Sequence, residues 1–389
     1  MLKLDLRDGR AGYWLGSVIL FVFCASFYAP ISSKASNNIF YAGLGLPALT
    51  WWLYRPRVAL DLFRVAPAFS VVYALLAAWL SLVDIAFLKD SSYLAVLFLC
   101  CAMLDRRGRG VVAAFGAFAL VSAGMFAYAV FDWIRLLDTL DVWPRVALWG
   151  QGQNPVYAAL LMASSFTFLW LFYVERRLAS RPRWLFWGAF ALLTALCGMC
   201  AIVFQARSAL IGFAAFFAAY LVQRRLVYAG LIVAAAALAT LSFSGLDGTL
   251  LERGLSFRLD IWLDALRRLS SDCSIWVGCG KDDYRFLGQF FHAHSAYVSI
   301  LYEGGAIALA LFLALAAVFF VTTWRSRSRW MLVALVGWAG VATTTPGVIV
   351  SPRTLWVFFW IPTLMAVLDS GRPALESYYR ARDAVSRRG

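Results

Sequence analysis

The sequence contains few charged side chains and almost no histidine. Asp, Glu, Lys and Arg make up 14% of the 389 residues, whereas a soluble domain carries about 25%. Hydrophobic residues make up 62%, above the roughly 45–50% of a soluble domain. The shortage of charge and the excess of apolar residues exclude an ordinary soluble protein. They predict an all-α integral membrane protein, because long apolar runs are typical of membrane-spanning helices.

Several sequence motifs that identify common enzyme classes are absent. The chain has no Walker loop, no dinucleotide fingerprint and no zincin motif. Acidic residues are also scarce, since 21 Asp and Glu stand against 35 Lys and Arg, a net charge of +14. This charge does not indicate nucleic-acid binding, because the basic residues form short clusters between apolar runs. Such clusters are typical of the signals that orient a membrane protein.

Twelve apolar runs follow one another along the chain and predict twelve membrane spans. They cover about 13–30, 39–54, 67–88, 92–104, 111–131, 156–174, 184–204, 208–222, 226–243, 296–322, 330–349 and 354–369. With the N-terminus inside, about two thirds of the Lys and Arg residues fall in the segments assigned to the cytoplasm. We therefore expect a single polytopic membrane domain, 1–389, with both termini in the cytoplasm.

One long polar segment, 244–295, separates the predicted spans nine and ten. Large apolar residues at a spacing of three or four predict an amphipathic helix over 259–269 within it. This apolar stripe consists of Leu259, Trp262, Leu263, Leu266 and Leu269. Cys273 and Cys279 lie in the same segment and could pair in an oxidising compartment, but the sequence does not decide this. We expect the segment to form a large outside loop that contains short helices.

The two histidines of the chain, His292 and His294, lie where this loop meets the apolar run that begins near Ala296. Imidazole titrates near neutral pH, so its position at a membrane–water boundary predicts proton chemistry there. Two alternatives remain open. The histidines could simply hydrogen-bond to the backbone, or they could bind zinc. A zinc site needs three or four protein ligands, for which Asp282, Asp283 or a cysteine would be required.

Three cations on the predicted outside face are candidates for binding an anionic substrate. Arg207 stands alone between two apolar runs, where a snorkelling side chain is the alternative interpretation. Arg258 opens the amphipathic segment and could instead pair with Asp260 or Asp264. Lys281 follows the sequence Gly278-Cys279-Gly280, which could approach a phosphate or form a plain turn.

These elements, in this order, resemble the O-antigen ligase and polymerase superfamily. The matching residues are Arg207, the Arg258-Leu-Asp-Ile-Trp262 element, Gly278-x-Gly280, and His294-Ser295 followed after nine residues by Gly305. The family has Gly-x-x-Gly at the last position, whereas this chain has Gly305-Ala-Ile-Ala308. Asn154-Pro155 also resembles a family element that precedes a span. The resemblance covers roughly 140–350, and the spacing after His294 together with the twelve-span layout favours the ligase branch.

The resemblance implies a glycosyltransferase reaction at the periplasmic face of a Gram-negative inner membrane. A ligase moves a glycan from undecaprenyl pyrophosphate to a sugar hydroxyl of lipid A–core, and needs no nucleotide or metal. His294 is then the expected general base, and Ser295 could orient it. Arg207 and Arg258 are the expected pyrophosphate ligands, with Lys281 as a third. His292 is not expected to act together with His294.

Two other functions remain possible from the sequence. The first is an O-antigen polymerase or a protein O-oligosaccharyltransferase, which would use the same donor and another acceptor. The second is a multispan transporter or flippase of lipid-linked sugars. Transporters usually contain internal repeats and charged or broken helices near mid-membrane. This sequence contains no evident repeat and few charges within its apolar runs, of which Asp84 is one.

Overall fold

A computed structural model describes residues 10–54, 56, 65–105, 110–139, 144–226, 228, 230, 257–282 and 284–371. Every regular element in these ranges is a helix, and the extended pairings there are two isolated bridges, Ser274 with Gly278 and Phe286 with Phe290. The predicted all-α class is therefore confirmed. Most of the predicted span 226–243, the predicted loop up to residue 256, and Asp283 lie outside the described residues.

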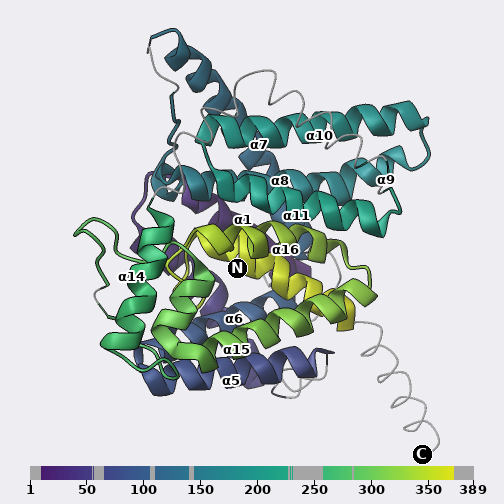
Figure 1. Cartoon of the computed structure of the whole chain (residues 1–389). Coiled ribbons are helices and arrows are strands. Elements are labelled where there is room, and N and C mark those ends of the chain that lie inside the picture. The colour runs from purple at the N-terminus through teal and green to yellow at the C-terminus, as the bar shows by residue number, and fades with distance from the viewer. Residues whose placement is uncertain are drawn as a thin grey trace, which may run out of the picture.

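The helices up to residue 137 form the first part of the bundle (Figure 1). They are α1 (Arg10–Ala25), η1 (Ser26–Tyr28), α2 (Ser33–Phe40), η2 (Tyr41–Gly45), α3 (Leu46–Tyr54), α5 (Pro67–Val83), α6 (Ala86–Asp105) and α7 (Gly110–Leu137). The π-helical segment η2 joins α2 and α3 without a break, so the chain stays helical from Ser33 to Tyr54.

The remaining helices complete the bundle and carry the polar loop. They are η3 (Gly150–Gln153), α8 (Pro155–Leu169), η4 (Trp170–Val174), α9 (Glu175–Leu178), α10 (Arg183–Phe204), α11 (Arg207–Gln223), α14 (Arg258–Ser271), α15 (Ala296–Arg325), α16 (Arg329–Gly340), η5 (Val341–Thr343) and η6 (Trp356–Trp360). The last of these continues as a helix to Gly371.

Among the described residues, five helical stretches are long and apolar enough to cross a membrane, judged by length and composition. They are Ala86–Asp105, Gly110–Leu137, Pro155–Leu178, Arg183–Phe204 and Ala296–Arg325. Shorter apolar helices accompany them at Tyr13–Tyr28, Pro67–Val83, Arg207–Gln223, Arg329–Thr343 and Trp356–Gly371. These helices support a multi-pass membrane protein, while the number of twelve spans stays a prediction.

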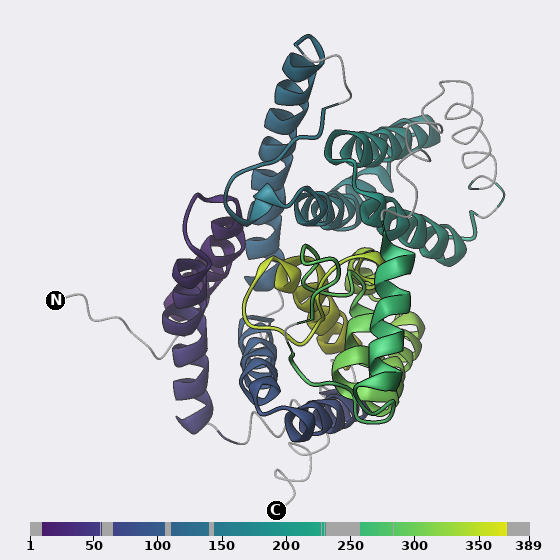
Figure 2. The same cartoon turned by 60° about the vertical axis from the view of Figure 1, so that its left-hand side comes forward.

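Helix α14 lies across one end of the bundle. In Figure 1 the helices α8, α10, α11, α16, α15 and α5 run in roughly the same direction, and α14 stands at their end, nearly perpendicular to α15. The view in Figure 2 brings α14 to the front, beside the polar segments that precede α15. The described part of the long polar segment, from residue 257 onward, thus gathers at a single end of the apolar bundle.

The amphipathic helix α14 is present, but its buried face matches the predicted apolar stripe only in part, through Leu269 and the partly buried Trp262. Leu259, Leu263 and Leu266 are 49%, 51% and 43% exposed. The buried residues are Ile261, Ala265 and Leu269, which pack in one cluster with Tyr284 and Tyr302. Small Ala265 at the centre of this face allows the helix to approach the two tyrosines closely, which a stripe of leucines would not.

Helix α15 is interrupted at Gly305, where φ is 71°. The polar loop docks against this interruption through backbone hydrogen bonds. The Ala306 N–H donates to the Ile275 carbonyl at 2.8 Å, and the Cys279 N–H donates to the Tyr302 carbonyl at 2.8 Å. The loop therefore satisfies backbone groups that a broken helix would otherwise leave unpaired.

A disulfide and two glycines give the docked loop its shape. Cys273 and Cys279, whose pairing the sequence left open, form a disulfide with a Cα–Cα distance of 5.2 Å. Gly278 and Gly280 have φ values of 87° and 72°, and a Cβ on Gly278 would lie 2.5 Å from the Gly305 nitrogen. The Gly-x-Gly element thus forms a turn that packs on α15.

We expect Gly305→Ala to lower the thermal unfolding temperature of the purified protein in detergent. The left-handed conformation alone costs a non-glycine residue about 1–3 kcal/mol. A Cβ at this position would also lie 2.2 Å from the Trp276 carbonyl oxygen. Gly188→Ala in α10 is the matched control, because a Cβ there meets nothing within 4 Å. Equal unfolding temperatures for the two variants would contradict the close docking.

Candidate functional site

Arg207 lies in the tight turn between α10 and α11. Helix α10 ends at Gln205, which adopts a left-handed conformation with φ of 48°, and α11 begins two residues later at Arg207. The preceding segment fastens this turn, since Arg145 Nε donates to the Phe204 carbonyl at 3.0 Å. The Gln205 side chain donates to the Pro144 carbonyl at 3.2 Å. Arg207 is consequently held, half-buried, at the end of two apolar helices.

Arg258 is the first residue of α14 and lies near Arg207. Burial lowers the pKa of the Arg258 guanidinium, and the positive charge of Arg207 lowers it further. Within the described part of the chain, no carboxylate forms an ion pair with Arg258. Asp264, a partner that the sequence suggested, instead pairs with Arg268 at 3.0 Å. The two arginines therefore repel each other, and an anion placed between them would relieve that repulsion.

Three contacts fix the loop before α15, which carries the two histidines. Trp262 of α14 donates from Nε1 to the Ala293 carbonyl at 2.8 Å. Ser295 caps α15, because its hydroxyl accepts from the Val298 N–H at 3.4 Å. The Ser295 hydroxyl is thus part of a helix cap, and the expected role in orienting His294 stays a prediction. The ring of Phe290 meets the ring of His294 edge-on, with centroids 5.7 Å apart.

His294 adopts a strained backbone conformation next to His292. Its φ is 50°, which costs a non-glycine residue about 1–3 kcal/mol. The His294 N–H donates to His292 Nδ1 at 3.1 Å, and the centroids of the two rings lie 3.9 Å apart. The two histidines are therefore in direct contact, which the sequence spacing did not suggest.

Arg207, Arg258, His292 and His294 share one cavity of about 610 Å³. The remaining lining residues are Arg145, Gln153, Asn154, Pro155, Val156, Tyr157, Gln205, Ile261, Phe290 and Thr344. No aspartate or glutamate occurs among these described lining residues. Three arginines and two imidazoles lie among these described lining residues, so the cavity is suited to an anionic ligand.

Both histidines are held in their neutral form. Burial lowers the pKa of His294 below its ordinary value of 6.5, and the nearby Arg258 lowers it further. Burial, the neighbouring His294 and the charge of Arg353 lower the pKa of His292 to about 4. A neutral imidazole can accept a proton, so the cavity combines a base with cations.

Lys281, the third predicted cation, does not line this cavity. Its ammonium group forms an ion pair with Asp90 of α6 at 2.5 Å and lies over the ring of Phe87. Its backbone N–H donates to the carboxylate of Asp84 at 3.0 Å. These contacts join the polar loop to the α5–α6 turn. A role of Lys281 in substrate binding stays a prediction.

Sequence reasoning did not select Arg145 and Arg353 as site residues. Arg145 lines the cavity, and Arg353 is close enough for its charge to lower the pKa of His292. Both belong to the basic residues on the predicted outside face. The rule that places basic residues on the cytoplasmic side does not explain basic residues outside. Their position on the outside face was therefore the signal that could have indicated Arg145 and Arg353.

The histidines do not belong to an evident metal site. Among the described residues, no group of three His, Cys, Asp or Glu side chains lies close enough together to hold a metal ion. Asp282, one of the ligands that the zinc interpretation required, accepts a hydrogen bond from the Tyr302 hydroxyl at 2.6 Å.

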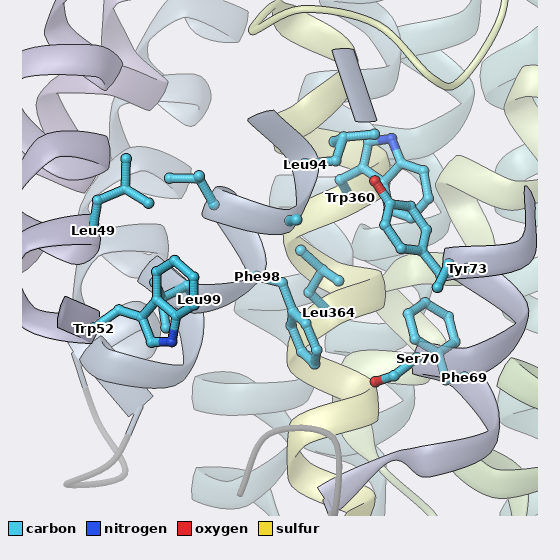
Figure 3. A pocket seen from close by; sticks show the side chains of 13 residues that line it. Leu49, Trp52, Phe69, Ser70, Tyr73, Leu94, Phe98, Leu99, Trp360 and Leu364 are labelled. Atoms are coloured by element: carbon cyan, nitrogen blue, oxygen red, sulfur yellow. The ribbon is translucent and has the colours of Figure 1, made fainter. Parts of the chain in front are cut away.

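A second cavity, of about 330 Å³, has a different character. Its walls come from α3, α5, α6 and the C-terminal helix, and almost all are apolar (Figure 3). The Tyr73 hydroxyl in this wall donates to the Ser91 carbonyl at 2.7 Å, and the Trp360 N–H donates to the Val348 carbonyl at 2.7 Å. The described residues that line this cavity include no charged side chain and no imidazole, in contrast to the first cavity.

The chain is similar in sequence to an O-antigen ligase. It is 29% identical to the O-antigen ligase of Pseudomonas aeruginosa (strain PAO1), over 91% of this chain and 88% of the relative. No protein-family model matches the chain. The similarity spans nearly the whole of both proteins and confirms the resemblance to the O-antigen ligase family.

The pKa values of the two histidines can be measured directly, because the chain contains only two. Histidine-labelled protein should give two imidazole signals by NMR, one titrating near pH 4 and one below 6.5. Arg258→Gln should raise the pKa of His294, because removal of a nearby cation favours the protonated ring. Arg267→Gln, on the exposed side of α14, is the control. An unchanged His294 pKa in Arg258→Gln would refute the proximity of the two groups.

Proposed function

We propose that this member of the O-antigen ligase family transfers a glycan from undecaprenyl pyrophosphate to a sugar hydroxyl of lipid A–core. The observation that carries the proposal is the convergence of Arg207, Arg258 and His294 on one cavity at the end of the apolar helices. The first two residues are cations for a pyrophosphate, and the third is a neutral base. A lipid-linked donor can reach such a cavity from the bilayer.

The two arginines bind the pyrophosphate of the donor. Their guanidinium groups present planar pairs of donors that match phosphate oxygens two at a time. Burial and mutual repulsion lower the pKa of Arg258, and a pyrophosphate between the two groups reverses this penalty. The same contacts become stronger as negative charge develops on the leaving group, which lowers the barrier to transfer.

His294 removes the proton of the acceptor hydroxyl. As the acceptor oxygen forms its bond to the anomeric carbon, the bond from that carbon to the pyrophosphate oxygen breaks. The hydroxyl proton moves to an imidazole nitrogen of His294, and undecaprenyl pyrophosphate leaves between the arginines. The lowered pKa of His294 keeps the imidazole neutral and ready to accept this proton. A single displacement inverts the anomeric centre.

The reaction takes place at the periplasmic face of the inner membrane. Two observations support this location. Arg258 and Ile261 of α14 line the cavity, and α14 lies beside the described part of the polar loop (Figure 2). The clusters of Arg around Arg176 and Arg325 lie on the side of the sequence pattern assigned to the cytoplasm. Both termini and these clusters then face the cytoplasm, in a layout of twelve spans.

Cysteine labelling tests this topology. We expect an impermeant maleimide to label Arg267→Cys of α14 in intact spheroplasts, and to label Arg181→Cys only after the membrane is opened, because the two positions lie on opposite faces. The native cysteines give a low background, since the described free cysteines are buried and Cys273 is bonded to Cys279. Labelling of both positions from the same side would disprove the topology.

Variants of the base and the cations test the mechanism. His294→Ala should lower the turnover of purified protein by about 10²–10⁴-fold, the usual contribution of a general base. Arg258→Lys should raise the KM for donor, because lysine keeps the charge and loses the planar pair of donors. Arg267→Lys on the outer side of α14 is the matched control for the arginine change.

Two results would contradict the mechanism. One is near-wild-type turnover of His294→Ala at matched expression. The other is an unchanged donor KM in Arg258→Lys and in Arg207→Lys. Offering a pilin-type peptide in place of lipid A–core as acceptor distinguishes the ligase from a protein O-oligosaccharyltransferase, since both use the same donor.

A further inference from the structure

We propose that His292 is a positioning residue, whose ring nitrogen holds the backbone of His294 so that the His294 imidazole faces the cavity. This inference rests on the proposed function, in which His294 is the base. The two side chains would then have separate tasks. His294 exchanges the proton, and His292 fixes where that exchange takes place.

The direct contact between the two residues carries this inference. The His294 N–H donates to His292 Nδ1 at 3.1 Å, over a separation of two residues. The two rings also lie against each other, with centroids 3.9 Å apart and planes inclined by 43°. A ring that accepts from the backbone of the next residue but one closes a small turn, as Asp and Asn side chains commonly do.

This turn is needed because His294 occupies the left-handed region, with φ of 50°. A non-glycine residue stays in that region only when its surroundings hold it there. The neighbouring residues are held by their own contacts, Ala293 by Trp262 and Ser295 by the cap of α15. The bond to His292 is the contact that acts on the His294 backbone itself.

An imidazole suits this task because of its two different nitrogens. When Nδ1 accepts a hydrogen bond, the proton of the neutral ring resides on Nε2. A protonated ring could not accept at Nδ1, so the hydrogen bond from the His294 N–H requires a neutral His292. Burial and the nearby charges of His294 and Arg353 keep the pKa of His292 low, at about 4. The contact is therefore expected to persist at pH values well above 4.

Other roles of His292 fit the structure less well. As a proton acceptor in place of His294 it would be the weaker base, since a group with the lower pKa binds protons less tightly. In addition, its Nδ1 lone pair is occupied by the His294 N–H. As a metal ligand it would need partners, and the described residues contain no suitable group of three.

Three variants in the full-length protein separate the hydrogen bond from the ring. His292→Asn keeps an acceptor near the place of Nδ1, because the Asn side-chain carbonyl can close the same turn. His292→Phe keeps a ring against His294 and removes the acceptor. His292→Ala removes both. Gln289→Ala, an exposed position in the same loop, is the matched control.

We expect His292→Phe and His292→Ala to lower kcat by about tenfold, with the donor KM within about twofold, since a lost positioning contact acts on the chemical step. His292→Asn should recover most of that loss. The pKa of His294, read from its NMR signal, gives a second measurement that is independent of transfer. It should rise toward 6.5 in the Phe and Ala variants and stay low in the Asn variant, because a displaced ring leaves its buried place beside Arg258.

Two results would overturn the proposal. One is an unchanged His294 pKa and kcat in His292→Phe. The other is an Asn variant as impaired as the Phe variant, which would mean that the acceptor atom is not what matters. If His292→Ala fails to fold, the Asn and Phe variants still show whether the acceptor atom at position 292 matters. If the wild-type protein transfers no glycan to lipid A–core, the proposed function fails, while the pKa measurement still tests the positioning role.

Discussion

The docking of the polar loop on the broken turn of α15 is the constraint on which the site depends. A helix in an apolar bundle cannot leave backbone groups unpaired, so the interruption at Gly305 must be closed from outside. Residues 275–280 supply that closure through their own backbone. The same loop carries Tyr284, against which α14 packs, and α14 begins with Arg258. One of the two site cations is thereby fixed relative to the bundle that holds the other, Arg207.

The electrostatic arrangement of the cavity favours an anionic ligand. Arg207 and Arg258 come from different helices, and burial together with the nearby charge of Arg207 lowers the pKa of Arg258. Burial lowers the pKa of His294, and the charge of Arg258 lowers it further, because a charged neighbour disfavours a second positive charge. Anion binding and the pKa of His294 are therefore coupled, since Arg258 would contact the anion and also lowers this pKa.

The sequence indicated residues that the structure brings to one cavity, and it missed part of the packing around them. Arg207, Arg258 and His294 were selected because a cation or an imidazole at a predicted membrane boundary is unusual in itself, and all three line the same cavity. The buried face of α14 was predicted only in part. Leu269 of the predicted stripe is buried, but hydrophobicity could not reveal that Ile261 and Ala265 pack with Tyr284 and Tyr302. The contact of Lys281 with Asp90 joins residues 191 apart in sequence. Local patterns carry no information on such a pair.

The disulfide of Cys273 with Cys279 has a consequence for when the protein becomes functional. Thiols stay reduced in the cytosol and oxidise in the periplasm. With the proposed topology, a loop that closes the break in α15 with the help of this bond reaches its final shape only after it has crossed the membrane. The helices would then insert during biosynthesis while the cavity is still incomplete. Under the same proposal export sets the time of maturation, and a newly made chain would consume no lipid-linked sugar before its loop reaches the periplasm.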